Sequence, residues 1–134
     1  MSKQRFVERQ AECASASNRL LEAIGLPESD IARDATIQRF EFTFELVWKT
    51  LKLYLERQGL ECGGPRMTLK MAFIQGLIQA PKDGDVWLTM LADRNLTSHA
   101  YDEALAKRIV EHIRNDYAPL LHGMVQTIQQ LAWD

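Results

Sequence analysis

The sequence has little cysteine and no long apolar run. Its two cysteines, Cys13 and Cys62, lie far apart and lack the short spacing that metal ligands need. We therefore expect two buried thiols in a reducing cytoplasm, with neither a disulfide nor a bound metal. No apolar run is long enough to span a bilayer, and the basic residues near the start precede no apolar stretch of a signal peptide. These absences predict a cytoplasmic protein without a membrane contact.

Signals for strands and for nucleotide-binding loops are also absent. The chain has no alternation of Val, Ile and Thr that would predict a strand, and no Asn-Gly pair that would predict a hairpin turn. There is no Gly-x-Gly-x-x-Gly, no Gly-Lys-Ser/Thr phosphate loop and no Gly-Ser with paired acids of a nucleotidyltransferase. We therefore expect no cofactor and no nucleotide transfer by the chain itself. Because the formal net charge is −2, contact with a nucleic acid requires a local basic patch.

What the sequence does contain is helical periodicity throughout. The 134 residues, 46% hydrophobic and 25% charged, predict one globular domain over residues 1–134. Apolar residues spaced by threes and fours predict helices over residues 3–24, 30–58, 68–79, 86–96 and 102–131. Residues 81–85 are predicted to form a turn, and Pro119 predicts a kink near residues 117–118. The expected fold is all-α, an up-and-down antiparallel bundle of four to five helices.

The second predicted helix is the longest and carries the most apolar surface. Phe42, Leu46 and Leu53 widen its apolar stripe, so we expect it to pack on more than one neighbour, with a second subunit as one candidate. Burial of its aromatic residues in a single core is the simpler alternative. Glu41 and Glu45 lie four residues apart on its polar face, where such spacing predicts a solvated surface.

The apolar rhythm lapses over residues 93–102, which hold the candidate site. Arg94, His99 and Tyr101 fall there within eight residues. A guanidinium can hold two phosphate oxygens, and an imidazole can exchange a proton with a hydroxyl at neutral pH. The phenol can donate a hydrogen bond, stack on a base or be modified. The alternative is a capping and packing cluster, with Arg94 on the last helical carbonyls and the two rings half-buried.

The Arg-x4-His-x-Tyr pattern from Arg94 to Tyr101 resembles the signature of the HEPN superfamily of small helical RNA-cleaving domains. In particular it resembles the HepT branch of toxins, also called nucleotidyltransferase substrate-binding proteins, which are paired with minimal nucleotidyltransferases. Residues 38–52 and the run from Trp87 to Leu91 are similar to that branch as well. The resemblance covers nearly the whole chain.

The resemblance implies a homodimeric, metal-independent endoribonuclease that acts on RNA. Arg94 would bind the scissile phosphate, His99 would act as general base or acid, and Asn95 would orient either partner. Tyr101 would be the residue that a cognate minimal nucleotidyltransferase, a separate chain, modifies with AMP to silence the nuclease. The added phosphate would place negative charge opposite Arg94 and block RNA.

Two rival interpretations use the same fold. In the first, the protein is a non-catalytic nucleotide- or substrate-binding subunit of a two-component nucleotidyltransferase. In the second, it is a structural oligomerisation module whose site has decayed. Outside the motif, His112 falls on an apolar helix face and is expected to be a hydrogen-bonded core residue rather than a metal ligand, because no further ligands lie close by.

Overall fold

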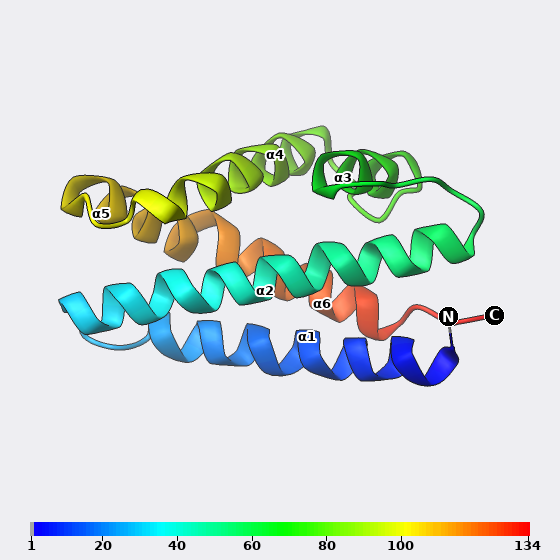
Figure 1. The fold of residues 1–134 in the computed structure, drawn as a ribbon, viewed down its shortest axis with the longest axis horizontal. Helices are drawn as coiled ribbons and strands as arrows, with labels where there is room; N and C mark the ends of the chain where they lie inside the picture. Colours follow the sequence, from blue (N-terminus) through cyan, green and yellow to red (C-terminus); the bar gives the residue numbers. More distant parts are fainter. Residues whose placement is uncertain (1) are drawn as a thin grey trace.

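The computed structural model describes residues 2–134 and contains only helices, turns and loops over that range (Figure 1). The elements in chain order are α1 (Lys3–Ile24), α2 (Asp30–Arg57), α3 (Pro65–Ile74), α4 (Pro81–Leu96), the 3-10 turn η1 (Thr97–His99), α5 (Glu103–His112), the π-helical turn η2 (Ile113–Tyr117) and α6 (Ala118–Gln129). The predicted all-α bundle is confirmed.

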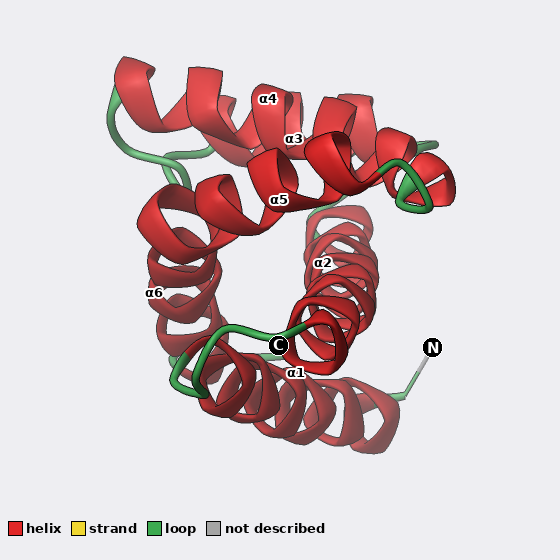
Figure 2. Ribbon diagram, turned by 90° about the vertical axis from the view of Figure 1, so that its left-hand side faces the viewer, coloured by secondary structure: helices red, strands yellow, loops and turns green. Residues whose placement is uncertain are grey.

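The helix α2 is the centre of the bundle. Its backbone lies close to α1, α3, α5 and α6, whereas α4 lies close to α3, η1 and η2 and meets α2 through side chains. Seen end-on, α1 lies beneath α2 and α6, and α3, α4 and α5 form the opposite layer (Figure 2). The chain runs up and down, because α1 and α2 form an antiparallel pair and α4 returns along α2 (Figure 1). The end of α4 meets α2 through Arg94, which contacts Glu41 and Glu45.

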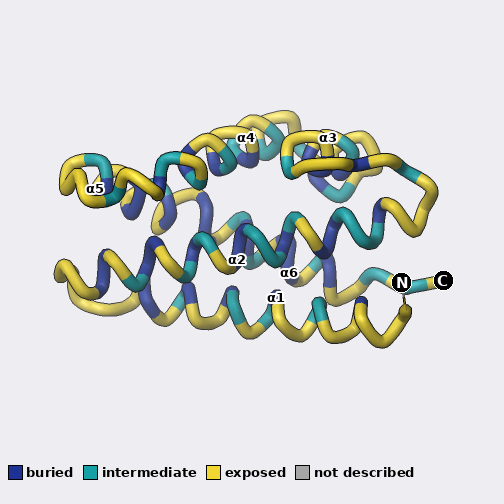
Figure 3. Tube along the Cα trace, viewed as in Figure 1, coloured by how far each residue is buried: buried dark blue, intermediate teal, exposed yellow. Residues whose placement is uncertain are grey.

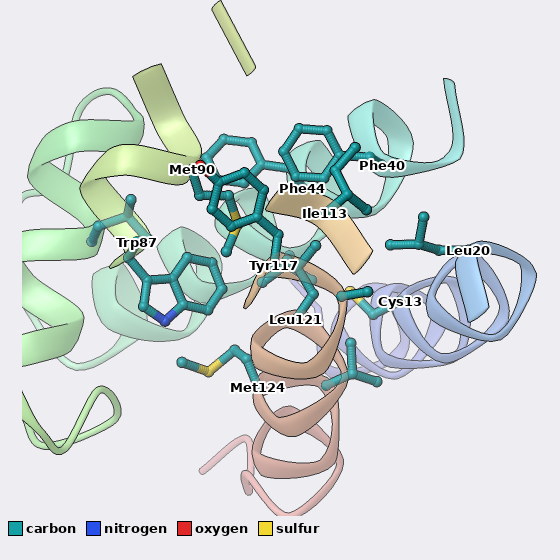
Figure 4. Packing of buried hydrophobic residues seen from close by; sticks show 14 of the residues in the cluster. Cys13, Leu20, Phe40, Phe44, Trp87, Met90, Ile113, Tyr117, Leu121 and Met124 are labelled. Atoms are coloured by element: carbon teal, nitrogen blue, oxygen red, sulfur yellow. The ribbon is translucent and has the colours of Figure 1, made fainter. Parts of the chain in front are cut away.

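Buried aromatic side chains hold α4 and η2 against α2. Phe40 stacks on Tyr117 with ring centroids 5.6 Å apart, and Phe44 lies 6.5 Å from Trp87 (Figure 4). All four rings are almost completely buried. Burial runs along the facing sides of the helices, and the outer sides are exposed (Figure 3). Large aromatic groups contribute much of the free energy of a core, so these contacts help to fix α4 and η2 on α2.

Two expectations near helix ends are confirmed: a cap of the second helix by Ser29 or Asp30, and a kink or break near residues 117–118. The Ser29 hydroxyl accepts a 3.0 Å hydrogen bond from the Ala32 N–H and caps α2. The predicted last helix is interrupted by η2, which ends at Tyr117, two residues before Pro119. A proline has no N–H to donate to the preceding turn, and the wider π-turn accommodates the missing bond.

The predicted bounds of the third and fourth helices were wrong. The third helix begins at Pro65, which suits the first turn because that N–H has no helical partner, and it ends before Gly76 at φ +81°. Phe73, which falls on the inward face that the apolar spacing of residues 68–79 predicts, is 40% exposed. Residues 81–85 are the first turn of α4 rather than a separate turn, again with a proline, Pro81, at the start.

The remaining expectations concern the thiols and the membrane. Cys13 and Cys62 are both buried and free, as predicted. Burial raises the pKa of the Cys13 thiol to about 11, against a partial lowering by its 3.3 Å contact with the Thr50 hydroxyl. No helix within residues 2–134 combines the length and the apolar character needed to cross a membrane.

Candidate functional site at the α4–α5 junction

The motif occupies the junction where α4 ends and α5 begins. Arg94 and Asn95 lie on the last turn of α4, His99 ends η1, and Tyr101 lies in the turn that follows. Asp102 closes this turn, because its Oδ1 accepts a 3.1 Å hydrogen bond from the Leu105 N–H and caps α5. The α4 helix ends at Leu96 and α5 begins at Glu103, so the short connection between them carries His99 and Tyr101, which are exposed.

Arg94 turns towards α2 and meets two carboxylates. Its Nη1 lies 3.3 Å from Glu41 Oε2, and its Nε lies 3.4 Å from Glu45 Oε1. The Nε atom is buried but makes no hydrogen bond with good geometry. The prediction that Glu41 and Glu45 form a solvated surface was wrong, since both are half-buried against the arginine. The spacing of four residues that suggested a polar face instead places both carboxylates on Arg94.

Thr97, a residue that the sequence did not single out, joins the two sides of this cluster. Its buried hydroxyl lies 3.0 Å from Glu41 Oε2 and 2.7 Å from the Arg94 carbonyl, and either oxygen can accept its proton. Arg94 Nη1 lies 3.3 Å from the same hydroxyl and can donate to it. Thr97 therefore holds the guanidinium beside Glu41. From the sequence, the only indication of this contact was the spacing of three residues, which places Thr97 near Arg94 on one helix face.

His99 and Tyr101 lie together on the surface. Their ring centroids are 6.1 Å apart in an edge-to-face arrangement. His99 is exposed, and the Tyr101 side chain is 86% exposed. The half-buried packing considered as an alternative is therefore not what these rings adopt. Arg94 and His99 share no hydrogen bond within residues 2–134, since one side chain faces α2 and the other faces solvent.

This arrangement has a defined chemical capacity. The exposed imidazole of His99 can exchange a proton with a bound molecule, and the phenol of Tyr101 is accessible to an enzyme. Arg94 offers a partly exposed cation next to them in the chain, already held by carboxylates. Asn95 is exposed and lines a groove between α3 and α4.

A second polar cluster forms around Asp93, the residue before Arg94 on α4. The buried Asp93 accepts a 2.6 Å hydrogen bond from the Tyr117 hydroxyl, and His112 Nδ1 lies 2.8 Å from the same oxygen. Burial, and then this hydrogen bond, raise the pKa of Tyr117 well above its usual range. The expectation that His112 is a hydrogen-bonded residue is confirmed, although its side chain is half-buried rather than in the core.

Asp93 itself was missed as a structural residue. It follows Trp87 and Met90 at helical spacing, so it lies on the buried side of α4, and a carboxylate there needs a partner.

Within the described residues no group of three or more His, Cys, Asp or Glu side chains is arranged to hold a metal ion.

The fold and site define a helical-bundle protein with an exposed His-Tyr pair beside a carboxylate-bound arginine. Residues 6–130 match the family described as nucleotidyltransferase substrate binding protein like, and the chain belongs to that family. It is also similar to a crystal structure of a protein from Thermus thermophilus, with 38% identity and a TM-score of 0.81. That similarity covers 88% of this chain and 99% of the other. No curated protein matches the chain.

Proposed function

We propose that this protein is the toxin subunit of a toxin–antitoxin pair, a metal-independent endoribonuclease that a cognate minimal nucleotidyltransferase silences. The observation that carries the proposal is the exposure of His99 and Tyr101 side by side, next to Arg94. Rings that served only to pack two helices together would be buried. Membership of the family independently implies association with a nucleotidyltransferase.

In the proposed reaction His99 takes the proton from a ribose 2′-hydroxyl. The 2′-oxygen then attacks the adjacent phosphorus, the bond from phosphorus to the 5′-oxygen breaks, and a 2′,3′-cyclic phosphate forms. Arg94 binds the phosphate and stabilises its developing charge, while Asn95 orients the phosphate or the imidazole. The leaving 5′-oxygen receives a proton from His99 of a second protomer, which is why the active form is a homodimer.

The carboxylates on Arg94 define a condition for this reaction. A phosphate that binds the guanidinium competes with Glu41 and Glu45, which lie 3.3 and 3.4 Å away. A planar guanidinium has five N–H donors, so it can keep one carboxylate and bind phosphate oxygens with its remaining donors. Thr97 and Glu41 then act as positioning residues for Arg94.

The homodimer is supported by apolar side chains left on the surface of α2. Phe42 is 58% exposed and lines a groove between α1 and α2 that also includes Glu45 and Leu46. Because Glu45 lines this groove and contacts Arg94, the groove adjoins the site. Sedimentation of a Phe42→Glu variant tests the assignment: a charge at a dimer contact shifts the protein towards monomer, whereas an unchanged sedimentation coefficient places the contact elsewhere.

Silencing is proposed to act at Tyr101. The phenol oxygen attacks the α-phosphate of ATP held by the partner enzyme, its proton is lost, and pyrophosphate leaves. The attached AMP adds negative charge and bulk beside His99 and Arg94, and RNA is then excluded. The exposure of Tyr101, the most exposed of the large hydrophobic side chains described, supports this role.

Cleavage of RNA in EDTA tests the nuclease. The unmodified protein is expected to cut RNA, and His99→Ala to lose at least about a hundredfold of that activity, as removal of a general acid or base does. His122→Ala is the matched control, since His122 lies on α6 against Ser17. If the unmodified protein and His99→Ala both leave RNA intact, with Tyr101 shown unmodified by mass spectrometry, the nuclease proposal fails.

That failure would favour the second candidate, a non-catalytic subunit that binds a nucleotide or substrate for the transferase. One specific observation supports it: Arg94 is already paired with two carboxylates, as in a structural ion-pair cluster. The family description also fits this role. If this second candidate is right, adding the protein changes the affinity of the transferase partner for its nucleotide. The His99→Ala variant is then expected to change that affinity by the same amount.

A further inference from the structure

A groove between α3 and α4 leads to the candidate site. Its outer part, of about 420 Å³, lies beside the start of α4, and its inner part, of about 650 Å³, lies beside the end of α4. Both parts are lined by Arg66, Lys70 and Leu88, so they adjoin. The inner part reaches Asn95, the residue next to Arg94. The two helices that form the groove lie side by side in both ribbon views (Figures 1 and 2).

The charge of the groove is positive at its middle. Arg66 and Lys70 lie one turn apart on α3 and are exposed. Within residues 2–134 neither makes an ion pair or a side-chain hydrogen bond, in contrast to Arg94 with its two carboxylates. The lining includes one carboxylate, Asp85, at the outer part, and none at the inner part. This is the local basic patch that a chain of net charge −2 requires for contact with nucleic acid.

An exposed aromatic ring lies next to these cations. Phe73 lines the outer part and is 40% exposed. Gly84 of α4 makes room for the ring, since a Cβ at that position would lie 3.3 Å from Phe73 Cδ2. A basic groove with an aromatic ring is the combination by which proteins bind single-stranded nucleic acid, with cations on the phosphates and the ring stacked on a base. The stretch from Pro81 to Asn95 is about 21 Å long, enough for several nucleotides.

We propose that the groove between α3 and α4 binds single-stranded RNA and directs it towards His99. Arg66 and Lys70 contact phosphates, Phe73 stacks on a base, and Asn95 marks the point where the strand enters the site. The proposal rests on the ribonuclease function proposed above and adds the path by which the substrate reaches the site.

Binding of a fluorescein-labelled oligouridylate, measured by anisotropy in EDTA, tests the groove. His99→Ala serves as the parent so that the RNA stays intact. Arg66→Gln with Lys70→Gln is expected to bind about tenfold more weakly, and to lower the slope of log affinity against log salt by about 1.4. Phe73→Leu is expected to weaken binding about fivefold. Lys3→Gln with Arg5→Gln, the same charge change on exposed residues of α1, is the control and stays within about twofold.

The outcomes separate the groove from the nuclease. The groove variant carries Arg66→Gln and Lys70→Gln in the His99→Ala parent. If the unmutated protein cleaves RNA and the groove variant binds RNA as tightly as the parent, the groove proposal is wrong and the nuclease proposal stands. If the groove variant loses binding but the unmutated protein cuts nothing, the groove stands and the nuclease fails. A chain that neither binds nor cuts RNA overturns both. If Lys3→Gln with Arg5→Gln weakens RNA binding as much as the groove substitutions do, the groove proposal is overturned. It is also overturned if the groove substitutions abolish transferase binding or self-association but leave the affinity for RNA unchanged. Circular dichroism melting checks that each variant folds.

Discussion

Asp93 and Arg94 are neighbours in the chain but belong to two different clusters. Asp93 is buried, and it is hydrogen-bonded to Tyr117 and His112. Arg94 points towards α2 instead, half-buried, between Glu41 and Glu45, with a buried Nε that lacks a good hydrogen bond. The first cluster ties α4 to α5 and η2, while the second adjoins the exposed rings of His99 and Tyr101.

We infer from this difference that Asp93 serves stability, whereas Arg94 remains available for the proposed binding. Buried polar groups with complete hydrogen bonds stabilise a fold. Removing one partner leaves the other buried without a hydrogen bond, so its desolvation penalty lowers the free energy of unfolding. A partly exposed ion pair contributes little to stability, because solvent screens it. Four predictions test whether the two clusters divide the work in this way, in order of decreasing expected effect.

Asp93→Ala is expected to reduce the free energy of unfolding by about 3 kcal/mol, because it leaves the buried hydroxyl of Tyr117 without an acceptor. Urea unfolding followed by circular dichroism measures the change. Asp85→Ala, on an exposed turn of the same helix, is the control and should stay within about 0.5 kcal/mol. Equal midpoints for the two variants would show that the Asp93 cluster contributes nothing to stability.

Arg94→Ala is expected to lower RNA cleavage by about a hundredfold while changing the free energy of unfolding by less than about 1 kcal/mol. The reason is that its partners Glu41 and Glu45 are themselves partly exposed. Single-turnover cleavage and urea unfolding are measured on the same samples, with the exposed Arg114→Ala as control. A variant that keeps its activity but unfolds as easily as Asp93→Ala would make Arg94 structural.

Tyr117→Phe is expected to cost about 1 kcal/mol at neutral pH, the net value of one buried hydrogen bond. The pKa of Tyr117 is raised in the folded protein, so its stabilisation is present below pH ~10, where unfolded tyrosine is neutral. Above that pH the unfolded chain ionises and the stabilisation is lost. The gap in stability between the wild type and Tyr117→Phe therefore narrows as the pH rises above about 10. Parallel curves across that pH would contradict the assignment.

Tyr101→Phe has the smallest expected effect on the protein alone: less than about 0.5 kcal/mol in stability, because the side chain is almost fully exposed. With the cognate transferase and ATP, the variant is expected to gain no AMP in intact-mass spectra. Tyr54→Phe, which keeps Tyr101, is the control and should gain it. A mass increase in Tyr101→Phe would move the modification to another residue.

The sequence predicted the local structure well where a single signal governs it. The first two helices, the Ser29 cap and the break before Pro119 follow from periodicity, a hydroxyl at a helix start and a proline without an N–H. The third and fourth helices were misplaced because Pro65 and Pro81 were interpreted as parts of loops. A proline is equally suited to the first turn of a helix, and local sequence does not distinguish the two.

The residues of the motif could also be found from sequence, since Arg94, His99 and Tyr101 stand out in a polar stretch of a helical chain. Their surroundings could not. Glu41 lies 53 positions before Arg94, and only the packing of α4 across α2 brings the two charges within 3.3 Å. The same packing turns Asp93 towards Tyr117 and leaves His99 and Tyr101 in solvent. Helix periodicity determines which face of a helix is apolar, whereas the partner of each polar group depends on which helices meet.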